Sequence, residues 1–277
     1  MGRFHRHDDG TIHSHEHDGP GHSHEHGHQH AHSHDEPLLS QNPDRAQLIG
    51  DHREYDTGLD RIDVLERIYD ENDAAAADNR ARLDAHGVTA VNLMSSPGSG
   101  KTTLLERTLK ALQGQVRCGV IEGDIETSLD ADRLSGFGAQ VSLLNTGDGF
   151  GGECHLDAPM VAHALDGLDL AELDLVLIEN VGNLVCPAEF DVGAHRRAMV
   201  ASVTEGEDKP LKYPVMFRSV DVVVINKIDL LPHLDFDMDL FLKNLQDVNP
   251  KAKVIRTCAT KGDGLDDWLD WLLEAMG

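Results

Sequence analysis

The sequence predicts an α/β fold, in which a mostly parallel sheet is flanked by helices and preceded by an N-terminal helix and a disordered tail. Short runs rich in Val, Ile and Leu alternate with helical stretches through residues 88–277, as in sheets covered on both faces. Apolar residues recur at three- and four-residue steps within residues 41–87, which is typical of one helix face. Residues 1–40 have almost no large apolar side chains with which to form a core.

Composition limits the classes of function. The 49 acidic residues outnumber the 24 basic ones, and the net charge of −25 argues against binding to nucleic acid or to an acidic membrane. The 4 cysteines do not form a disulfide framework and favour a reducing, cytoplasmic compartment. Because no apolar run approaches about 18 residues, and residues 1–35 lack a hydrophobic segment, we expect neither a membrane span nor a signal peptide.

The tail is rich in histidine, since 12 of the 18 histidines lie between His5 and His34. Neutral imidazoles bind nickel, copper, zinc and cobalt, and a flexible chain can offer several of them to one ion. The predicted nickel ligands are His13, His15, His17, His22, His24, His26, His28, His30, His32 and His34. The alternatives to a metal-binding tail are an expression tag and a solvated linker.

A polar linker and one long helix are expected between the tail and the α/β domain. Apolar residues recur at Leu59, Ile62, Leu65, Ile68 and Tyr69. The helix is expected to break near Asn72 and to end at Gly87.

The domain at residues 88–277 should then alternate strands and helices. The expected strands are Ala90–Met94, Val116–Ile121, Val141–Leu144, Leu173–Ile178, Val220–Ile225 and Lys253–Arg256. The expected helices lie near 102–112, 128–135, 156–166, 236–247 and 265–275.

A glycine-rich loop follows the first expected strand and leads into a helix, which is the context of a P-loop NTPase. Glycines let backbone N–H groups approach phosphate oxygens, and the helix N-terminus favours negative charge. The predicted nucleotide ligands here are Gly98, Ser99, Gly100, Lys101, Thr102 and Thr103. Lys101 should reach the β- and γ-phosphates as a catalytic cation, and Thr102 should ligate Mg²⁺. Ser95 stands where the usual pattern has its first glycine.

The base should be read by the segment after the strand Val220–Ile225. That segment contains Asn226, Lys227 and Asp229, and Thr257–Lys261 follows the next strand. A carboxylate at position 229 can accept both donors on the edge of guanine, which adenine does not present there. We therefore predict GTP rather than ATP as the nucleotide.

Carboxylates for the Mg²⁺ shell should lie at strand ends near the phosphates. Asp124 and Glu179 follow two expected strands, and both are predicted to bind Mg²⁺ or to position the attacking water, so both are predicted catalytic residues. The alternative is that they are ordinary solvated acids at strand ends.

The cysteines separate by context. Cys118 lies inside an expected strand and should be a core residue, and packing is also the expected role of Cys258. Cys154, His155 and Cys186 lie on expected loops beside the nucleotide, where two thiols and an imidazole could bind a soft divalent metal. Spacing alone leaves a purely structural role open.

Four blocks of the sequence closely resemble the HypB family, the GTPases that help insert nickel into nickel–iron hydrogenase. The blocks are Ser95–Thr103, Gly152–Ala158, Glu179–Phe190 and Glu205–Pro214, and the resemblance extends over roughly residues 59–277. It implies a SIMIBI-type G domain, a GTP-dependent homodimer, and a nickel or zinc site at the subunit interface built from Cys154, His155 and Cys186. It also implies two partners, a nickel metallochaperone of the HypA type and the precursor of the hydrogenase large subunit.

The sequence departs from the family pattern at its beginning. Many members carry an N-terminal Cys-x-x-Cys-Gly-Cys nickel site, whereas this chain has no cysteine before Cys118. The histidine tail resembles the nickel-storing variant of the family. In the expected mechanism, GTP and Mg²⁺ order the loops near Asp124, Cys154 and Cys186, and hydrolysis releases them so that the metal can move to an acceptor.

Two other functions are alternatives to hydrogenase maturation. A urease-type nickel GTPase similar to UreG would carry a Glu-Ser-Gly-Gly block, where this chain has Glu179–Gly182, and a Cys-Pro-His motif that this chain lacks. A nickel or zinc storage protein with a vestigial nucleotide site is disfavoured by the intact Lys101, Thr102 and Asp229. Lys209 and Lys212 are candidates for phosphate contacts that the sequence alone does not assign.

Overall fold

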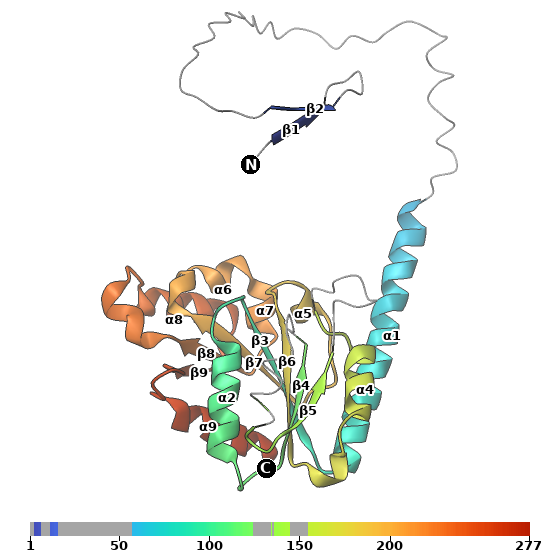
Figure 1. Ribbon diagram of the computed structural model, residues 1–277, viewed down its shortest axis with the longest axis vertical. Helices are drawn as coiled ribbons and strands as arrows, with labels where there is room; N and C mark the ends of the chain where they lie inside the picture. Colours follow the sequence, from blue (N-terminus) through green and yellow to red (C-terminus); the bar gives the residue numbers. More distant parts are fainter. Residues whose placement is uncertain (1–2, 7–11, 16–56, 124–133, 135, 145–154) are drawn as a thin grey trace, which may run out of the picture. The chain divides into compact units, whose positions relative to one another are not determined.

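A parallel sheet of seven strands lies at the centre of the unit Tyr55–Gly277 in the computed structural model (Figure 1). Its strands are β3 (Thr89–Ser95), β4 (Cys118–Glu122), β5 (Gln140–Leu143), β6 (Leu175–Gly182), β7 (Arg196–Ser202), β8 (Val222–Asn226) and β9 (Lys253–Arg256). They are arranged in the order β5-β4-β6-β3-β7-β8-β9, and each neighbouring pair is parallel. The predicted α/β fold with a parallel sheet is confirmed.

The structure describes residues 3–6, 12–15, 57–123, 134, 136–144 and 155–277. Most of the helix expected near 128–135 lies outside these residues, and so do Asp124 and Cys154.

Helices cover both faces of the sheet because consecutive residues of each strand point to opposite faces. Helices α2 (Lys101–Leu112) and α9 (Leu265–Met276) pack on one face, where the indole of Trp268 donates to Thr108 Oγ1 at 2.8 Å. On the other face, α1 (Thr57–Ala85) and α4 (Ala158–Asp166) cover the half that contains β4 and β6. Helices α7 (Pro214–Arg218) and α8 (Met238–Val248) cover the half that contains β7 and β8.

Short helices connect these elements. At the edge where the strands end they are α5 (Cys186–Glu189), η4 (Val203–Glu205), α6 (Lys209–Lys212) and η5 (Ile228–His233). At the opposite edge, η3 (Leu170–Glu172) precedes β6. The sequence predicts none of them, because each is too short to show a period of apolar residues.

The six expected strands are present; the bounds of Lys253–Arg256 are as predicted, and the ends of the other five differ by up to four residues. The sequence misses β7, although it lies in the middle of the sheet between β3 and β8. This strand begins with Arg196 and Arg197, and its buried part, Ala198–Ser202, contains two alanines and a serine. Its apolar character is therefore weaker than that of its neighbours.

Helix α1 is continuous from Thr57 to Ala85, so the predicted break near Asn72 is wrong. Asn72 is buried, and its amide makes tertiary hydrogen bonds rather than competing with the helix backbone. The predicted end is confirmed, because Gly87 has a φ of +66° and the Val88 N–H donates to Leu83 O at 3.0 Å. No helix among the described residues is long and apolar enough to cross a membrane.

The N-terminal unit, residues 1–54, contains a two-stranded antiparallel ladder of β1 (Arg3–Arg6) and β2 (Ile12–His15). The sequence predicts no regular structure in this segment. In the ladder, His5 lies opposite His13. The predicted tail ligands from His17 to His34 lie outside the described residues.

Candidate functional site

The predicted phosphate-binding loop (the phosphate loop), residues 96–100, connects β3 to α2. Gly98 and Gly100 have positive φ values of +72° and +96°. A Cβ on Gly100 would lie 2.4 Å from Asn226 Nδ2, so only glycine fits there. Ser95 belongs to β3, where an extended backbone suits any residue, and its hydroxyl donates to Ser96 O at 2.8 Å. The departure from glycine at this position therefore introduces no backbone strain.

Three predicted site residues meet directly at the start of α2. Lys101 Nζ lies 3.1 Å from Glu179 Oε1, and the Thr102 hydroxyl donates to the same oxygen at 2.7 Å. The side chains of Lys101 and Glu179 are 4% and 0% exposed. Within the described part of the chain, Glu179 Oε2 is buried without a hydrogen-bond partner. Hydroxyl and carboxylate oxygens are the donors that Mg²⁺ prefers, so Thr102 and Glu179 fit such an ion.

The last residue of β8, Asn226, and the loop after it are hydrogen-bonded to the phosphate loop. Asn226 Nδ2 donates to Ser99 O at 2.8 Å, and Lys227 Nζ donates to Gly98 O at 2.6 Å. Asn226 Oδ1 accepts from the Ala259 N–H at 3.0 Å, which adds the segment after β9. Asn226 and Lys227, both predicted nucleotide ligands, therefore lie where they brace the loop that would hold the phosphates.

Asp229 lies on η5 beside the segment that follows β9. Its Oδ1 accepts from Cys258 Sγ at 3.0 Å, and its Oδ2 lies 3.1 Å from Lys261 Nζ. The Cys258 hydrogen bond, followed by that of Lys261, holds the pKa of Asp229 below its ordinary value. The carboxylate is thus ionised near neutral pH, as an acceptor for two guanine donors has to be. Cys258 is buried as predicted, and it also positions this carboxylate.

Glu205 is a residue of this region to which the sequence assigns no role. It closes a capping box with Ser202 at the start of η4, and the Ser96 hydroxyl of the phosphate loop donates to its Oε2 at 2.5 Å. Lys209 Nζ lies 3.6 Å from the same oxygen, so Lys209 is near the phosphate loop. Lys212 pairs instead with Asp208 at 2.6 Å. The Ser-x-x-Glu spacing of the capping box is a sequence signal that could have identified Glu205.

The predicted metal ligands that the structure describes lie around Phe190. The ring of His155 packs on Phe190 with centroids 4.3 Å apart, and Cys186 begins α5, the helix that ends just before Phe190. Tyr69 of α1 also stacks on Phe190, with centroids 5.3 Å apart, and its hydroxyl donates to Glu189 Oε2 at 3.2 Å. The charge of Glu189 raises the pKa of Tyr69. Among the described residues, no three His, Cys, Asp or Glu side chains are placed to share a metal ion.

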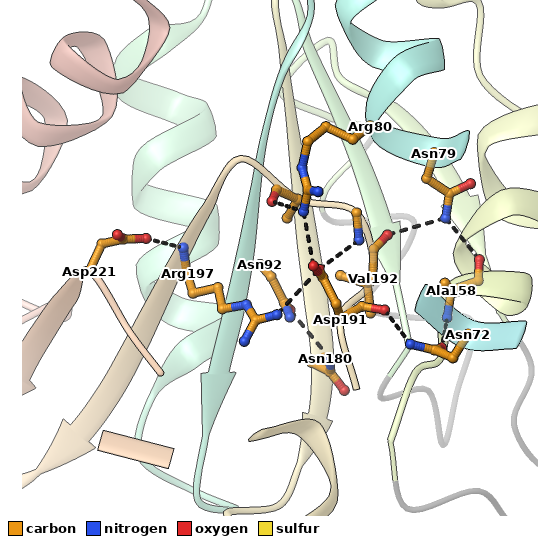
Figure 2. Close-up of polar contacts among 12 residues, drawn as sticks. Asn72, Asn79, Arg80, Asn92, Ala158, Asn180, Asp191, Val192, Arg197 and Asp221 are labelled. Atoms are coloured by element: carbon orange, nitrogen blue, oxygen red, sulfur yellow. Dashed lines mark hydrogen bonds and ion pairs between the residues drawn. The ribbon is translucent and has the colours of Figure 1, made fainter. Parts of the chain in front are cut away.

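Asn180 connects the phosphate side to the His155 segment, and the sequence assigns it no role. It follows Glu179 in β6, so the two side chains point to opposite faces of the sheet. Its Oδ1 accepts from the Leu156 N–H at 3.1 Å. Its Nδ2 donates to Asn92 Oδ1 at 3.3 Å, as Figure 2 shows. Asn180 therefore joins the strand position next to Glu179 to the residue after His155.

The remaining described cysteine, Cys118, is buried in β4. Burial raises the pKa of its thiol to about 12. Its predicted role as a core residue is confirmed.

The family model described as CobW/HypB/UreG, nucleotide-binding domain, matches residues 89–256. The hydrogenase maturation factor HypB of Azotobacter vinelandii is 48% identical, over 82% of this chain and 75% of the relative. The crystal structure of HypB from Archaeoglobus fulgidus has a TM-score of 0.69 at 40% identity, over 75% of this chain and 99% of that one. The structure of HypB from Helicobacter pylori in complex with nickel also has a TM-score of 0.69, at 38% identity over 74% and 95%.

The residues 89–256 matched by the family model include both the phosphate loop and the segments that carry His155 and Cys186. The chain belongs to the HypB family of hydrogenase maturation factors.

Proposed function

We propose that the chain is a GTP-hydrolysing metallochaperone that stores nickel and helps insert it into nickel–iron hydrogenase. The observation that carries this proposal is the hydrogen-bonded unit formed by the phosphate loop and the base-side loop, in which Lys101, Glu179 and Asp229 all occupy positions suited to a guanine nucleotide. Its relatives are hydrogenase maturation factors, and one of them was solved with nickel.

The nucleotide half works by positioning charge. The backbone N–H groups of residues 98–103 and Lys101 hold the β- and γ-phosphates, and Asp229 accepts from the guanine edge. Thr102 and Glu179, with Asp124, would hold Mg²⁺, which would neutralise charge on the phosphates when bound. Lys101 then stabilises the charge that develops as an in-line water attacks the γ-phosphate.

The metal half carries the cargo. Cys154, His155 and Cys186 bind nickel or zinc, and the ten tail histidines store nickel. GTP favours one geometry of a homodimer, and hydrolysis relaxes the segment after Glu179, so that the metal can pass to an acceptor. The partners in this proposal are a HypA-type nickel metallochaperone and the hydrogenase large-subunit precursor, in the cytoplasm.

Turnover tests the proposal against a storage protein with a vestigial nucleotide site. The full chain should hydrolyse GTP slowly, should require Mg²⁺ to do so, and should hydrolyse ATP far less well. Absence of hydrolysis of either nucleotide by folded protein would favour storage. Nickel counting adds a second measurement, because deletion of residues 1–40 removes 12 of 18 histidines and should sharply lower the nickel bound per chain.

A further inference from the structure

Two buried asparagines of α1 hold the same pair of backbone segments (Figure 2). Asn72 Nδ2 donates to Asp191 O at 2.8 Å, and its Oδ1 accepts from the Ala158 N–H at 2.9 Å. Asn79 Nδ2 donates to Ala158 O at 2.9 Å and to Val192 O at 3.2 Å. Asn72 and Asn79 are 4% and 3% exposed, and they lie two turns apart on one face of the helix.

The two segments are those that carry the described metal ligands. Ala158 begins α4, shortly after His155, and Asp191 follows α5, the helix that Cys186 begins. Each asparagine bridges both segments, so the pair fixes the distance between them at two points. Helix α1 makes a third contact in the same place through Tyr69, which touches Phe190, the ring on which His155 packs.

The segment after α5 is held rigidly against α1. Arg80 Nη2 lies 3.0 Å from Asp191 Oδ2, and Asp191 Oδ1 accepts from the Gly193 N–H at 2.9 Å. Gly193 has a φ of +86°, and a Cβ there would come within 2.5 Å of Ala76 O, midway between the two asparagines. The backbone thus approaches α1 as closely as it can, and the asparagine amides set its position along the helix.

Docking of a helix by itself does not require such groups. An apolar stripe would bury α1 without the desolvation cost of two amides, and amides compensate that cost only when their partners lie at fixed distances and angles. Two buried amides that bridge the same two segments are therefore suited to fixing a geometry.

We propose that Asn72 and Asn79 are positioning residues of the metal site, which hold the His155 and Cys186 segments at the separation that metal binding needs. This inference rests on the proposed function, because it takes His155 and Cys186 as ligands. It places part of the control of metal affinity on a helix outside the nucleotide-binding domain matched at residues 89–256.

Cobalt(II) binding to the full chain tests the proposal. Absorption from thiolate-to-cobalt charge transfer reports cysteine coordination alone, so the tail histidines do not contribute to it. We expect the double variant Asn72→Ala/Asn79→Ala to bind cobalt at the thiolates about 10- to 100-fold more weakly than the parent chain. Its affinity for GDP should stay within about 2-fold of the parent value, because neither asparagine contacts the phosphate or base loops.

Arg82→Ala is the matched control. Arg82 also joins α1 to α4, through Asp166 at 2.7 Å and Leu165 O at 3.1 Å, but these contacts lie at the opposite end of α4 from Ala158. It should lower thermal stability while leaving the cobalt absorption and affinity unchanged.

Different results would overturn the positioning role of the two asparagines and the metal site itself. Parent-like cobalt affinity in folded Asn72→Ala/Asn79→Ala, together with a lowered Tm, would make the asparagines structural and overturn the inference. If the double variant does not bind GDP, the two single variants decide by the same criterion. If Cys186→Ser leaves the charge-transfer band of the parent chain intact, the metal site itself is wrong, and the positioning role is overturned with it.

Discussion

The half of this domain proposed to bind the nucleotide and the half proposed to bind the metal are held in different ways. On the nucleotide side, the predicted functional groups contact one another, as Lys101 and Thr102 contact Glu179 and Asn226 braces the phosphate loop. On the metal side, the segments of His155 and Cys186 are held by Asn72 and Asn79 of α1 through main-chain hydrogen bonds. The first half should respond mainly to changes within it, and the second also to changes on a distant helix.

The largest effect should come from Lys101→Ala. The variant removes the cation that would stabilise the phosphate charge, so GTP turnover should fall by about 10³- to 10⁵-fold. It also leaves Glu179 buried without its ion-pair partner, which should lower the free energy of unfolding by about 3 kcal/mol. Phosphate release and denaturant unfolding measure the two effects.

The control for this variant is Lys110→Ala, which removes an exposed lysine of the same helix. It should change neither quantity. Adding Glu179→Gln to Lys101→Ala should restore stability without restoring turnover, since the buried charge is then absent. Normal GTP turnover in folded Lys101→Ala would refute the assignment of the phosphate loop.

Asp229→Asn should have the next largest effect. An amide presents a donor where guanine also presents donors, so preference for GTP should fall by about 10³-fold, whereas xanthosine triphosphate, whose 2-oxo group accepts, should bind better. Competition binding of the two nucleotides measures the change. Asp235→Asn, at an exposed position just after η5, should leave the nucleotide preference unaltered. An unchanged preference in Asp229→Asn would mean that the base is read elsewhere.

The phosphate and base loops could be located from the sequence because their residues are close along the chain and their spacing is fixed. The strand, glycine loop and helix around Lys101 form a continuous stretch, and Asn226 ends the buried strand β8, with Lys227 and Asp229 close behind it. Even the unusual Ser95 is explained by its extended conformation in β3.

The asparagine contacts could not be predicted in this way. Asn72 reads as a weak point in an amphipathic helix, because its partners Ala158 and Asp191 lie 86 and 119 residues away along the chain. Asn180 lies inside the block Glu179–Phe190, but its contact with Leu156 depends on how the segment that leads into α4 is placed over β6. Such roles depend on tertiary packing, which local periodicity does not encode.

Asn180→Ala should reduce the coupling between the two halves. The parent chain should bind cobalt at its thiolates about 5-fold or more differently with GDP and with a GTP analogue. In the variant, the Leu156 N–H loses Asn180 Oδ1 as its acceptor. The difference in cobalt affinity between the two nucleotide states should therefore shrink to less than about 2-fold. Asn92→Ala is the control, since it removes another partner of Asn180 and leaves the Leu156 contact in place. Equal nucleotide dependence in both variants would show that coupling takes another route.

The smallest effect is expected at the opposite end of the sheet, where Arg117 and Asp174 precede β4 and β6. Hydrogen bonds from the Arg117 side chain lower the pKa of Asp174 to about 2. Because the pKa in the folded state lies below the unfolded value of about 3.9, the ionised carboxylate stabilises the fold above about pH 4. That contribution is lost as the pH falls toward 2. Both side chains are partly exposed, so screening limits it to about 1 kcal/mol or less.

Asp174→Asn should therefore lower stability slightly at pH 7 and flatten the decline of stability between about pH 4 and 2, both measured by denaturant unfolding. GTP turnover and thiolate–cobalt binding should be unchanged at pH 7, since Asp174 lies at the strand starts and the two functional halves lie beyond the strand ends. If Asp174→Asn lost GTP turnover or thiolate–cobalt binding, both halves would depend on overall stability. The contrast between the nucleotide half, held by contacts among its own functional groups, and the metal half, held by α1, would then not hold. Unchanged activities would provide the baseline against which the effects of Asn72, Asn79 and Asn180 are judged.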